Sequence, residues 1–190
     1  MYTSAAFPDI AFENDRARLF ADYWASLPKI DLVPMRSAFD PSDVPHLLQT
    51  CEIHELVRPG VVLVRLSGSD MANRYSGDIT GKNYLDIVDP SRRDKVWRAL
   101  SHIVNHPSAM CVRIRNVRAS GLVTDAEAVG FPFRGADGRA TQIIYQSNIN
   151  NPKELWDYRQ DTRKMSRALG RTYIDIGAGV PDWDPAEDEE

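Results

Sequence analysis

Apolar residues near the start of the chain recur at helical spacing and predict the first element. One face of the segment between residues 12 and 27 is apolar, and the opposite face is charged. The apolar positions are Phe12, Leu19, Phe20, Tyr23, Trp24 and Leu27. We therefore expect an amphipathic helix over 12–27, ended by Pro28. Its stripe can pack on its own domain or on a second copy, and the pattern leaves both open. The prediction carried forward is a homodimer through this helix.

The pattern then changes to short apolar runs that are typical of strands. Residues 51–57 and 61–66 are two such runs, joined by the tight turn Pro59-Gly60. The second run is β-branched and nearly continuous, which favours a strand buried on both faces. A short helix is expected before them, over about 41–50, because Asp40 followed by proline is a good helix start.

Two further helices are expected after this hairpin. Gly68 lets the chain leave the strand sharply, and a short helix should follow over 70–75. A second helix starts at Asp89-Pro90 and ends at Asn105, before another proline. Its apolar stripe, which should face the sheet, consists of Val96, Trp97, Leu100, Ile103 and Val104.

Alternating segments predict three more strands. They run over residues 110–118, 122–133 and 142–149. If the first two pair antiparallel, Asp125 and Glu127 lie across from Arg113 and Arg115. We interpret these charges as a solvated face that holds the register. The opposite face offers Ala126, Ala128 and Gly130, whose small side chains leave room for the helix or for a ligand.

The C-terminal part has helical composition followed by an acidic tail. Residues 153–169 are expected to form a helix with Gly170 as its C-cap, and the proline-containing tail after it should lack regular structure. The two cysteines, Cys51 and Cys111, fall in predicted strands. In a reducing cytoplasm two buried thiols are the expected state, rather than a disulfide.

Composition narrows the function classes. The net charge is -4 and the pI is near 5.6, which disfavours nucleic acid as a partner. No apolar run approaches the ~18 residues that a membrane span needs, and the acidic residues near the N-terminus do not suit a signal peptide. We therefore expect a cytoplasmic protein. The four histidines and two cysteines show no metal-ligand spacing.

Several short motifs, in a fixed order from Leu27 to about Asn150, carry a family resemblance. They are Val64-Arg65-Leu66-Ser67-Gly68-Ser69, Arg74-Tyr75, Asp78-Ile79-Thr80-Gly81-Lys82, Leu85-Asp86-Ile87, and Phe131-Pro132-Phe133 with Asp137-Gly138. In these residues the chain resembles the short, stand-alone PAS-domain proteins of bacteria, which have no catalytic output module. Ser76 stands where that family usually has a glycine, so the flexible point of the loop shifts to Gly77.

The resemblance implies an α+β fold: a five-stranded antiparallel sheet with helices on one face. The N-terminal amphipathic helix and the C-terminal helix are additions to it. The expected organisation is an arm and helix over 1–28, a PAS-like domain over 29–150, and a helix with an acidic tail over 151–190. The implied role is a sensor or adaptor in bacterial signal transduction that contacts a protein signalling partner.

The resemblance does not supply a cofactor, because PAS domains bind haem, flavin, small acids or nothing. Haem-binding members use a histidine on the long helix, and the corresponding His102 falls on the side away from the apolar stripe, towards solvent. Photosensing members use a cysteine in the segment where this chain has 81–85, and none is present there. His46 and His54 lie on different predicted elements, and a lone histidine is more often a surface residue than a metal ligand.

A core cavity remains as the candidate site. Its expected walls, and the predicted ligand-binding residues, are Met71, Tyr75, Tyr84, Trp97, Met110, Val112 and Tyr145. These residues either line a ligand pocket or simply fill the core. Buried polar groups of Tyr and Trp need hydrogen-bond partners, which favours the ligand pocket. The prediction is a non-enzymatic sensor. The alternative is a small α+β enzyme of the cone-shaped isomerase or dehydratase type, which would need a buried ionisable residue in the same cavity.

Overall fold

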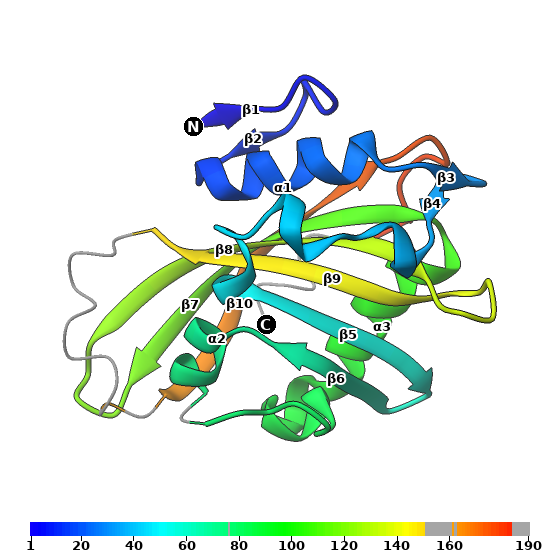
Figure 1. Cartoon of the computed structure of the whole chain (residues 1–190). Coiled ribbons are helices and arrows are strands. Elements are labelled where there is room, and N and C mark those ends of the chain that lie inside the picture. Colours follow the sequence, from blue (N-terminus) through cyan, green and yellow to red (C-terminus); the bar gives the residue numbers. More distant parts are fainter. Residues whose placement is uncertain (76, 151–160, 162, 184–190) are drawn as a thin grey trace.

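A six-stranded antiparallel sheet forms the centre of the computed structural model, which describes residues 1–75, 77–150, 161 and 163–183 (Figure 1). The strand order is β10-β7-β8-β9-β5-β6. The strands are β5 (Cys51–Arg58), β6 (Val61–Ser67), β7 (Ser108–Arg118), β8 (Val123–Arg134), β9 (Ala140–Ile149) and β10 (Arg163–Asp175). Two small hairpins, β1 (Tyr2–Thr3) with β2 (Ala11–Phe12) and β3 (Lys29–Ile30) with β4 (Val33–Pro34), lie outside it.

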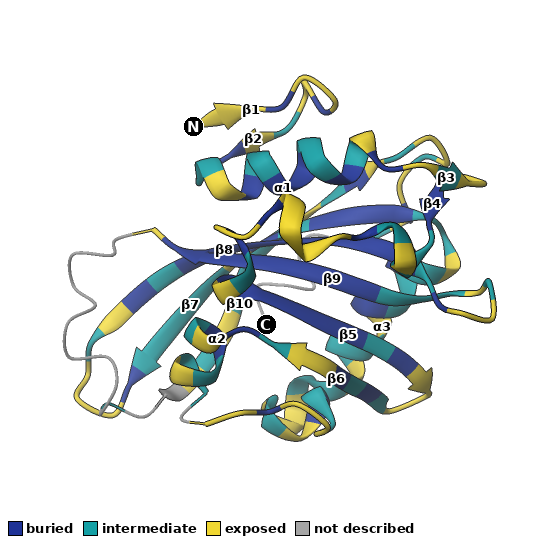
Figure 2. Cartoon of the chain, in the orientation of Figure 1, coloured by how far each residue is buried: buried dark blue, intermediate teal, exposed yellow. Residues whose placement is uncertain are grey.

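Helices cover both faces of this sheet. The long helix α1 (Asp15–Ser26) lies on one face, and α2 (Ser69–Arg74) and α3 (Arg93–Asn105) lie on the other (Figure 1). The short 3-10 turns are η1 (Arg36–Ala38), η2 (Pro41–Asp43), η3 (Leu48–Thr50), η4 (Tyr84–Ile87) and η5 (Pro90–Arg92). Buried residues concentrate in β8, β9 and β5, between the two helical layers (Figure 2). The predicted α+β architecture and antiparallel sheet are confirmed, but the sheet has six strands rather than five.

The apolar stripe of α1 is buried against its own sheet. Trp24 stacks on Phe131 with ring centroids 4.7 Å apart, and Phe20 meets the same ring edge-on at 5.8 Å. The indole N–H of Trp24 donates to the Pro132 carbonyl at 3.1 Å. The intramolecular alternative is therefore confirmed. The homodimer through this helix stays a prediction, and the buried side chains of the stripe, such as Phe20 and Trp24, are not available to it.

The C-terminal prediction was also wrong. Residues 163–169, expected in a helix, begin strand β10, and Gly170 lies inside that strand at a register shift rather than at a helix cap. Pairing of β10 with β7 along its whole length overrides a helical composition, because tertiary context outweighs propensity. The rest of the predicted helix, residues 153–160 and 162, and the acidic tail 184–190 lie outside the described residues.

Strand β6 is an edge strand and is not buried on both faces. Val62 and Val64 are buried, whereas Leu66 is exposed. The chain itself covers this edge: the Val64 N–H donates to the Lys82 carbonyl at 3.0 Å, and the Gly81 N–H donates to the Val64 carbonyl at 2.8 Å. The loop before η4 thus protects the edge from pairing with another chain.

The predicted helix over 41–50 is two separate 3-10 turns, η2 and η3. Asp40 caps η2 as expected, since its carboxylate accepts from the Ser42 N–H at 2.8 Å. Pro45 lies between the turns; proline has no N–H to continue a helix, which explains the interruption. Val44 and Leu47 still reach the core.

The predicted register between β7 and β8 is confirmed, but half of the charged face is not solvated. Arg115 pairs with Asp125, both with well-exposed side chains, at 2.6 Å. Glu127, opposite Arg113, is only 1% exposed. Its carboxylate accepts the backbone N–H groups of Glu13 and Asn14 at 2.8 and 2.9 Å, at the start of α1. Helix α1 covers this part of the face, which the local pattern of β8 does not reveal.

Candidate functional site

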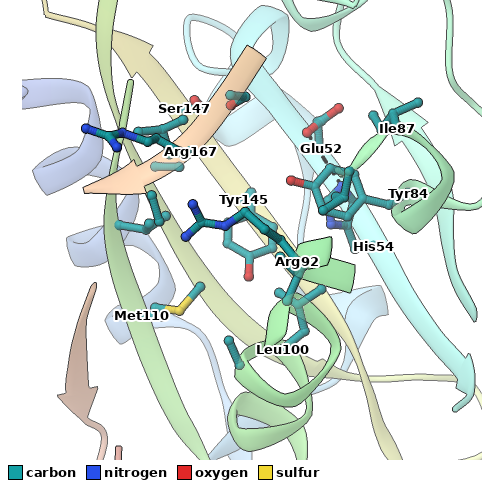
Figure 3. Close-up of a pocket in the computed structure, with 18 of the residues that line it drawn as sticks. Glu52, His54, Tyr84, Ile87, Arg92, Leu100, Met110, Tyr145, Ser147 and Arg167 are labelled. Atoms are coloured by element: carbon teal, nitrogen blue, oxygen red, sulfur yellow. Dashed lines mark ion pairs between the residues drawn. The ribbon is translucent and has the colours of Figure 1, made fainter. Parts of the chain in front are cut away.

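A cavity of about 350 Å³ lies between the sheet and the layer formed by α2, η4, η5 and α3 (Figure 3). Its walls come from β5, β7, β8, β9 and β10 on the sheet side. Strand alternation produces this arrangement, because every second side chain of each strand points to the same face. In β5, Cys51 and Ile53 therefore pack under α1, while Glu52 and His54 point into the cavity.

Six of the seven predicted wall residues line this cavity. They are Met71, Tyr75, Tyr84, Met110, Val112 and Tyr145. Trp97 does not line it; it packs, partly buried, against the same hydrophobic cluster. The structure thus brings the set together at one place. That these residues bind a ligand stays a prediction.

Glu52 is the buried carboxylate of the cavity. The Tyr75 hydroxyl donates to its Oε2 at 3.3 Å, and the Ser67 hydroxyl donates to its Oε1 at 3.3 Å. The Nε2 atom of His54 lies 3.5 Å from the same Oε2. A buried charge is stabilised by such partners, so the Glu52 carboxylate is held in place from β5, β6 and the end of α2.

His54 is held between two tyrosine rings. Its imidazole lies 4.5 Å from the ring of Tyr84 and 5.2 Å from that of Tyr145, measured between centroids. The residue is 3% exposed, and neither ring nitrogen has a hydrogen-bond partner among the described residues. One imidazole nitrogen is a donor and the other an acceptor in the neutral form. The His54 side chain therefore brings a donor and an acceptor to the cavity wall, with Nε2 near the Glu52 carboxylate.

Tyr145 adds a buried hydroxyl to the same place. Within the described part of the chain this hydroxyl has no hydrogen-bond partner, and burial raises the pKa of Tyr145 well above its usual value. The phenol therefore stays protonated. Its ring lies across Gly130 in the paired strand, where an added Cβ would come within 2.2 Å of the ring. The room predicted from the small residues of β8 is thus partly filled by Tyr145 itself.

The other side of the cavity is cationic. Arg167 and Arg171 of β10 line this side, and the Arg171 guanidinium lies over the Trp183 ring, 5.2 Å from its centroid. Arg92 extends from η5 into the cavity (Figure 3). Asp89 also lines this side, and its carboxylate accepts from the Ser91 N–H at 2.9 Å and the Ser91 hydroxyl at 2.6 Å. These hydrogen bonds lower the pKa of Asp89 and occupy it as the cap of η5.

Comparison with known proteins gives a family. A family model described as a PAS domain matches residues 13–145, which is more than half of the chain and includes α1. This chain belongs to the PAS-domain family. Membership supports a sensory, signalling role and a PAS-like α+β fold. No curated protein matches the chain.

Solved structures of light-oxygen-voltage proteins are similar to this PAS domain at low identity. A structure of an RNA-binding light-oxygen-voltage receptor is 18% identical, with a TM-score of 0.41, over 70% of this chain and 40% of that one. The blue-light photoreceptor Aureochrome1 LOV is 16% identical, with a TM-score of 0.39, over 56% and 85%. The LOV protein of Rhodobacter sphaeroides is 12% identical, with a TM-score of 0.41, over 58% and 68%. This chain therefore spans well under half of the receptor.

The residues that the common PAS cofactors would use lie outside the cavity. His102 does not point to solvent as predicted; its ring packs against Tyr173 at 6.1 Å and Trp183 at 5.8 Å, and it does not line the cavity. Both cysteines are free thiols on the α1 side of the sheet. Neither a histidine on α3 nor a cysteine is thus positioned to bond a cofactor in this pocket.

Sequence reasoning missed Glu52 and His54. The signal was present as an apolar–polar–apolar–polar alternation over Cys51, Glu52, Ile53 and His54. Both faces of β5 are covered, so that alternation does not show on its own which polar residues are buried.

Among the described residues, the helices are too short or too polar to span a bilayer.

Proposed function

We propose that this PAS domain is a non-enzymatic sensor of bacterial signal transduction that acts in the cytoplasm. A small molecule binds in the cavity, and the bound state is read by a second copy or a signalling protein. One observation carries the proposal: two nearly completely buried side chains, His54 and Tyr145, present to a cavity of about 350 Å³ polar atoms that have no hydrogen-bond partner within the described part of the chain. That volume is within the range of small-molecule sites, and buried polar groups normally have partners.

Contacts of the cavity suggest how occupancy is transmitted. Glu52 holds Tyr75 at the end of α2, and the preceding Arg74 donates to the Ser147 hydroxyl and carbonyl on β9, both at 3.1 Å. Arg118 of β7 donates to the carbonyl of Asp161, just before β10, at 3.0 Å. A ligand that draws Glu52 or His54 towards it would alter the position of α2. Output then passes through α2 or β10, because the stripe of α1 is buried.

A binding screen with a cavity-filling variant tests this proposal. Ala128 lines the cavity from β8, so Ala128→Leu should reduce the free volume and leave the fold intact, which circular dichroism checks. Ligand-detected NMR with a fragment library should give hits for the wild type that Ala128→Leu loses. If no fragment binds, or if all hits survive in the folded variant, the cavity is not a ligand site.

A second candidate function is a small proton-transfer enzyme. The observation that favours it is a histidine and a carboxylate together in the pocket, with His54 Nε2 3.5 Å from Glu52. In such an enzyme Glu52 would orient His54, His54 would remove a proton from a carbon next to a carbonyl, and the Tyr145 hydroxyl would donate to the developing oxyanion. NMR in D₂O with phenylpyruvate tests it. An enzyme would exchange the acidic C–H proton for deuterium faster than buffer alone, and His54→Gln would abolish this acceleration. A sensor would leave the exchange rate at its value in buffer.

A further inference from the structure

The chain reverses its direction directly after the last strand of the sheet. Residues 176–183, which we call the C-terminal strap, follow β10 and lie near the hairpin of β3 and β4 (Figure 1). The Asp175 carboxylate fixes the reversal, since its Oδ1 atom accepts from the Gly177 and Gly179 N–H groups at 2.7 and 2.8 Å. Both glycines have a positive φ, 117° and 79°, which other residues rarely adopt. The sequence itself therefore sets the path of the strap.

A side chain from the N-terminal part of the chain holds the strap at this reversal. Leu32, in the turn between β3 and β4, lies against Gly177, where an added Cβ would come within 2.9 Å of Leu32 Cδ2. Leu32 itself has a φ of 70°, a left-handed value that is unusual for a large side chain. The strap thus begins at a position where only glycine fits.

At its other end the strap places an aromatic ring between α3 and β10. The rings of His102 and Tyr173 meet the Trp183 ring edge-on, with centroids 5.8 and 5.9 Å away. The Arg171 guanidinium lies over the same ring, 5.2 Å from its centroid. Edge-on aromatic pairs and a cation over an indole are attractive beyond their apolar contact. We call the three side chains around Trp183, which are His102, Arg171 and Tyr173, the tryptophan site.

The tryptophan site is held in place by the domain rather than by the strap. The Tyr173 hydroxyl donates to the Ala99 carbonyl of α3 at 3.1 Å, and Tyr173 pairs with Met110 of β7. Arg171 lies two positions earlier on β10, on the same face, and also lines the cavity. The site therefore stays assembled when Trp183 leaves it, and one of its side chains belongs to the cavity wall.

The strap and its site are complementary in charge. Asp182 and Asp184 flank Trp183 in the sequence, and Asp182 is exposed. The site contributes the guanidinium of Arg171, and Arg98 lies one helical turn before the histidine of the site, on the same face of α3. A tryptophan between two carboxylates therefore matches an aromatic site that is bordered by arginines.

We propose that the tryptophan site binds a segment of a partner protein in which a tryptophan is flanked by carboxylates, and that the C-terminal strap is the built-in competitor for this site. The strap occupies the site in the free protein, and the partner segment displaces Trp183. The strap suits this role because the indole N–H of Trp183 is buried without a hydrogen-bond partner in the described part of the chain, which weakens its hold. This inference goes beyond the proposed function and does not depend on a ligand in the cavity.

An exchange experiment on the full chain tests the competition. Trp183→Ala vacates the site, and the probe is a synthetic peptide of residues 176–190. NMR titration of the isotope-labelled variant should show that the peptide binds and shifts the signals of His102 and Tyr173. The wild type should bind the peptide about tenfold or more weakly, because its own strap competes at an effective concentration in the millimolar range. A control peptide that carries Trp183→Ala should bind neither protein.

A second variant loosens the strap at its other end and leaves Trp183 and its site intact. In Gly177→Ala the added Cβ would collide with Leu32, so the strap should compete less and the peptide should bind more tightly than to the wild type. Gly121→Ala is the matched control, because Gly121 has a φ of 91° in the turn before β8 and its Cβ would meet nothing within 4 Å. Circular dichroism verifies each fold, and this pair decides the matter if Trp183→Ala does not fold.

Three results would overturn the inference. The peptide binds the wild type as well as the two strap variants, the control peptide binds equally well, or no folded variant binds the peptide; in each case Trp183 only fills the core. If the wild type dimerises and Trp183→Ala is monomeric, the occupant is the strap of a second copy, which overturns a separate partner. Fragment binding in the cavity is measured independently, so the proposed function stands or fails on its own.

Discussion

Single residues in this domain are constrained by what lies across the sheet from them. Gly130 is the clearest case, because its missing side chain leaves the space that the Tyr145 ring occupies in the paired strand. Glycine in a strand often marks such a close approach, and an aromatic neighbour that covers it stabilises the sheet. Tyr145 is one wall of the cavity, so Gly130 shapes the site without touching it through a side chain.

Gly130→Ala should destabilise the domain by about 1–3 kcal/mol, the usual cost of overpacking. The added Cβ would lie 2.2 Å from the Tyr145 ring, which must move. Gly170→Ala is the matched control in β10, because its Cβ would meet only the Arg113 guanidinium at an ordinary 3.6 Å. Urea unfolding measures both. Equal changes in the free energy of unfolding would show that the destabilisation comes from replacing a strand glycine and not from the contact with Tyr145.

Glu127 and Asp125 are neighbours on one strand whose pKa values shift in opposite directions. Burial raises the pKa of Glu127, against the hydrogen bonds it accepts from Glu13 and Asn14. The hydrogen bond from Arg115 lowers the pKa of Asp125. A raised carboxyl pKa means that the folded state binds the proton more tightly than the unfolded state, so its contribution to stability falls as the pH rises. With a lowered pKa, the contribution to stability falls as the pH falls.

The pH dependence of unfolding should therefore differ between Glu127→Gln and Asp125→Asn. Relative to Glu127→Gln, the wild type should lose stability as the pH rises from 4.5, the ordinary pKa of a Glu carboxyl, through the raised value. Relative to Asp125→Asn, it should lose stability as the pH falls below 3.8, the ordinary Asp value. Urea titrations between pH 3 and 8 measure both slopes, and slopes of the same sign would contradict this assignment.

Among the helices and strands, the sequence pattern predicted those whose structure depends on residues close together in the chain. The stripe of α3 and its end at Asn105 follow from residues within the helix itself, whereas the predicted start at Asp89-Pro90 is the start of the 3-10 turn η5, and α3 begins at Arg93. Strand β10 does not follow from nearby residues, because its state depends on pairing with β7, some fifty residues earlier in the chain. The burial of His54 and Glu127 likewise depends on which distant helix covers each face. The sequence therefore predicted most of the residues that line the cavity, but not the buried polar residues Glu52 and His54.

Helix α1 should behave as part of the core rather than as a dimerisation device. Trp24→Ala should cost about 3–5 kcal/mol, because it removes a fully buried aromatic side chain and its bond to Pro132. Arg16→Ala, on the exposed face of the same helix, should change stability by less than about 0.5 kcal/mol. Chemical unfolding and size-exclusion chromatography check this. If the wild type is a dimer and Trp24→Ala is a stable monomer, α1 would instead be a dimerisation helix.

At the scale of the whole molecule, the two faces of the sheet have different tasks. The α1 face is a buried aromatic core around Phe131, and both cysteines lie there. The opposite face is incompletely filled and contains Glu52, His54, Tyr145 and the arginines in one cavity. One face thus supplies stability, and the other contains the cavity in which we propose that a ligand binds.

Hydrogen–deuterium exchange of the full chain, with and without the tightest-binding fragment, can show whether the cavity senses a ligand. Because Glu52 and Tyr75 connect the cavity to α2, the bound fragment should slow exchange in β5 and β9 and also change it in α2. The α1 face, which lies on the other side of the sheet, should be unchanged. Exchange that is unaltered in β5, β9 and α2, or altered only on the α1 face, would contradict a ligand-sensing cavity.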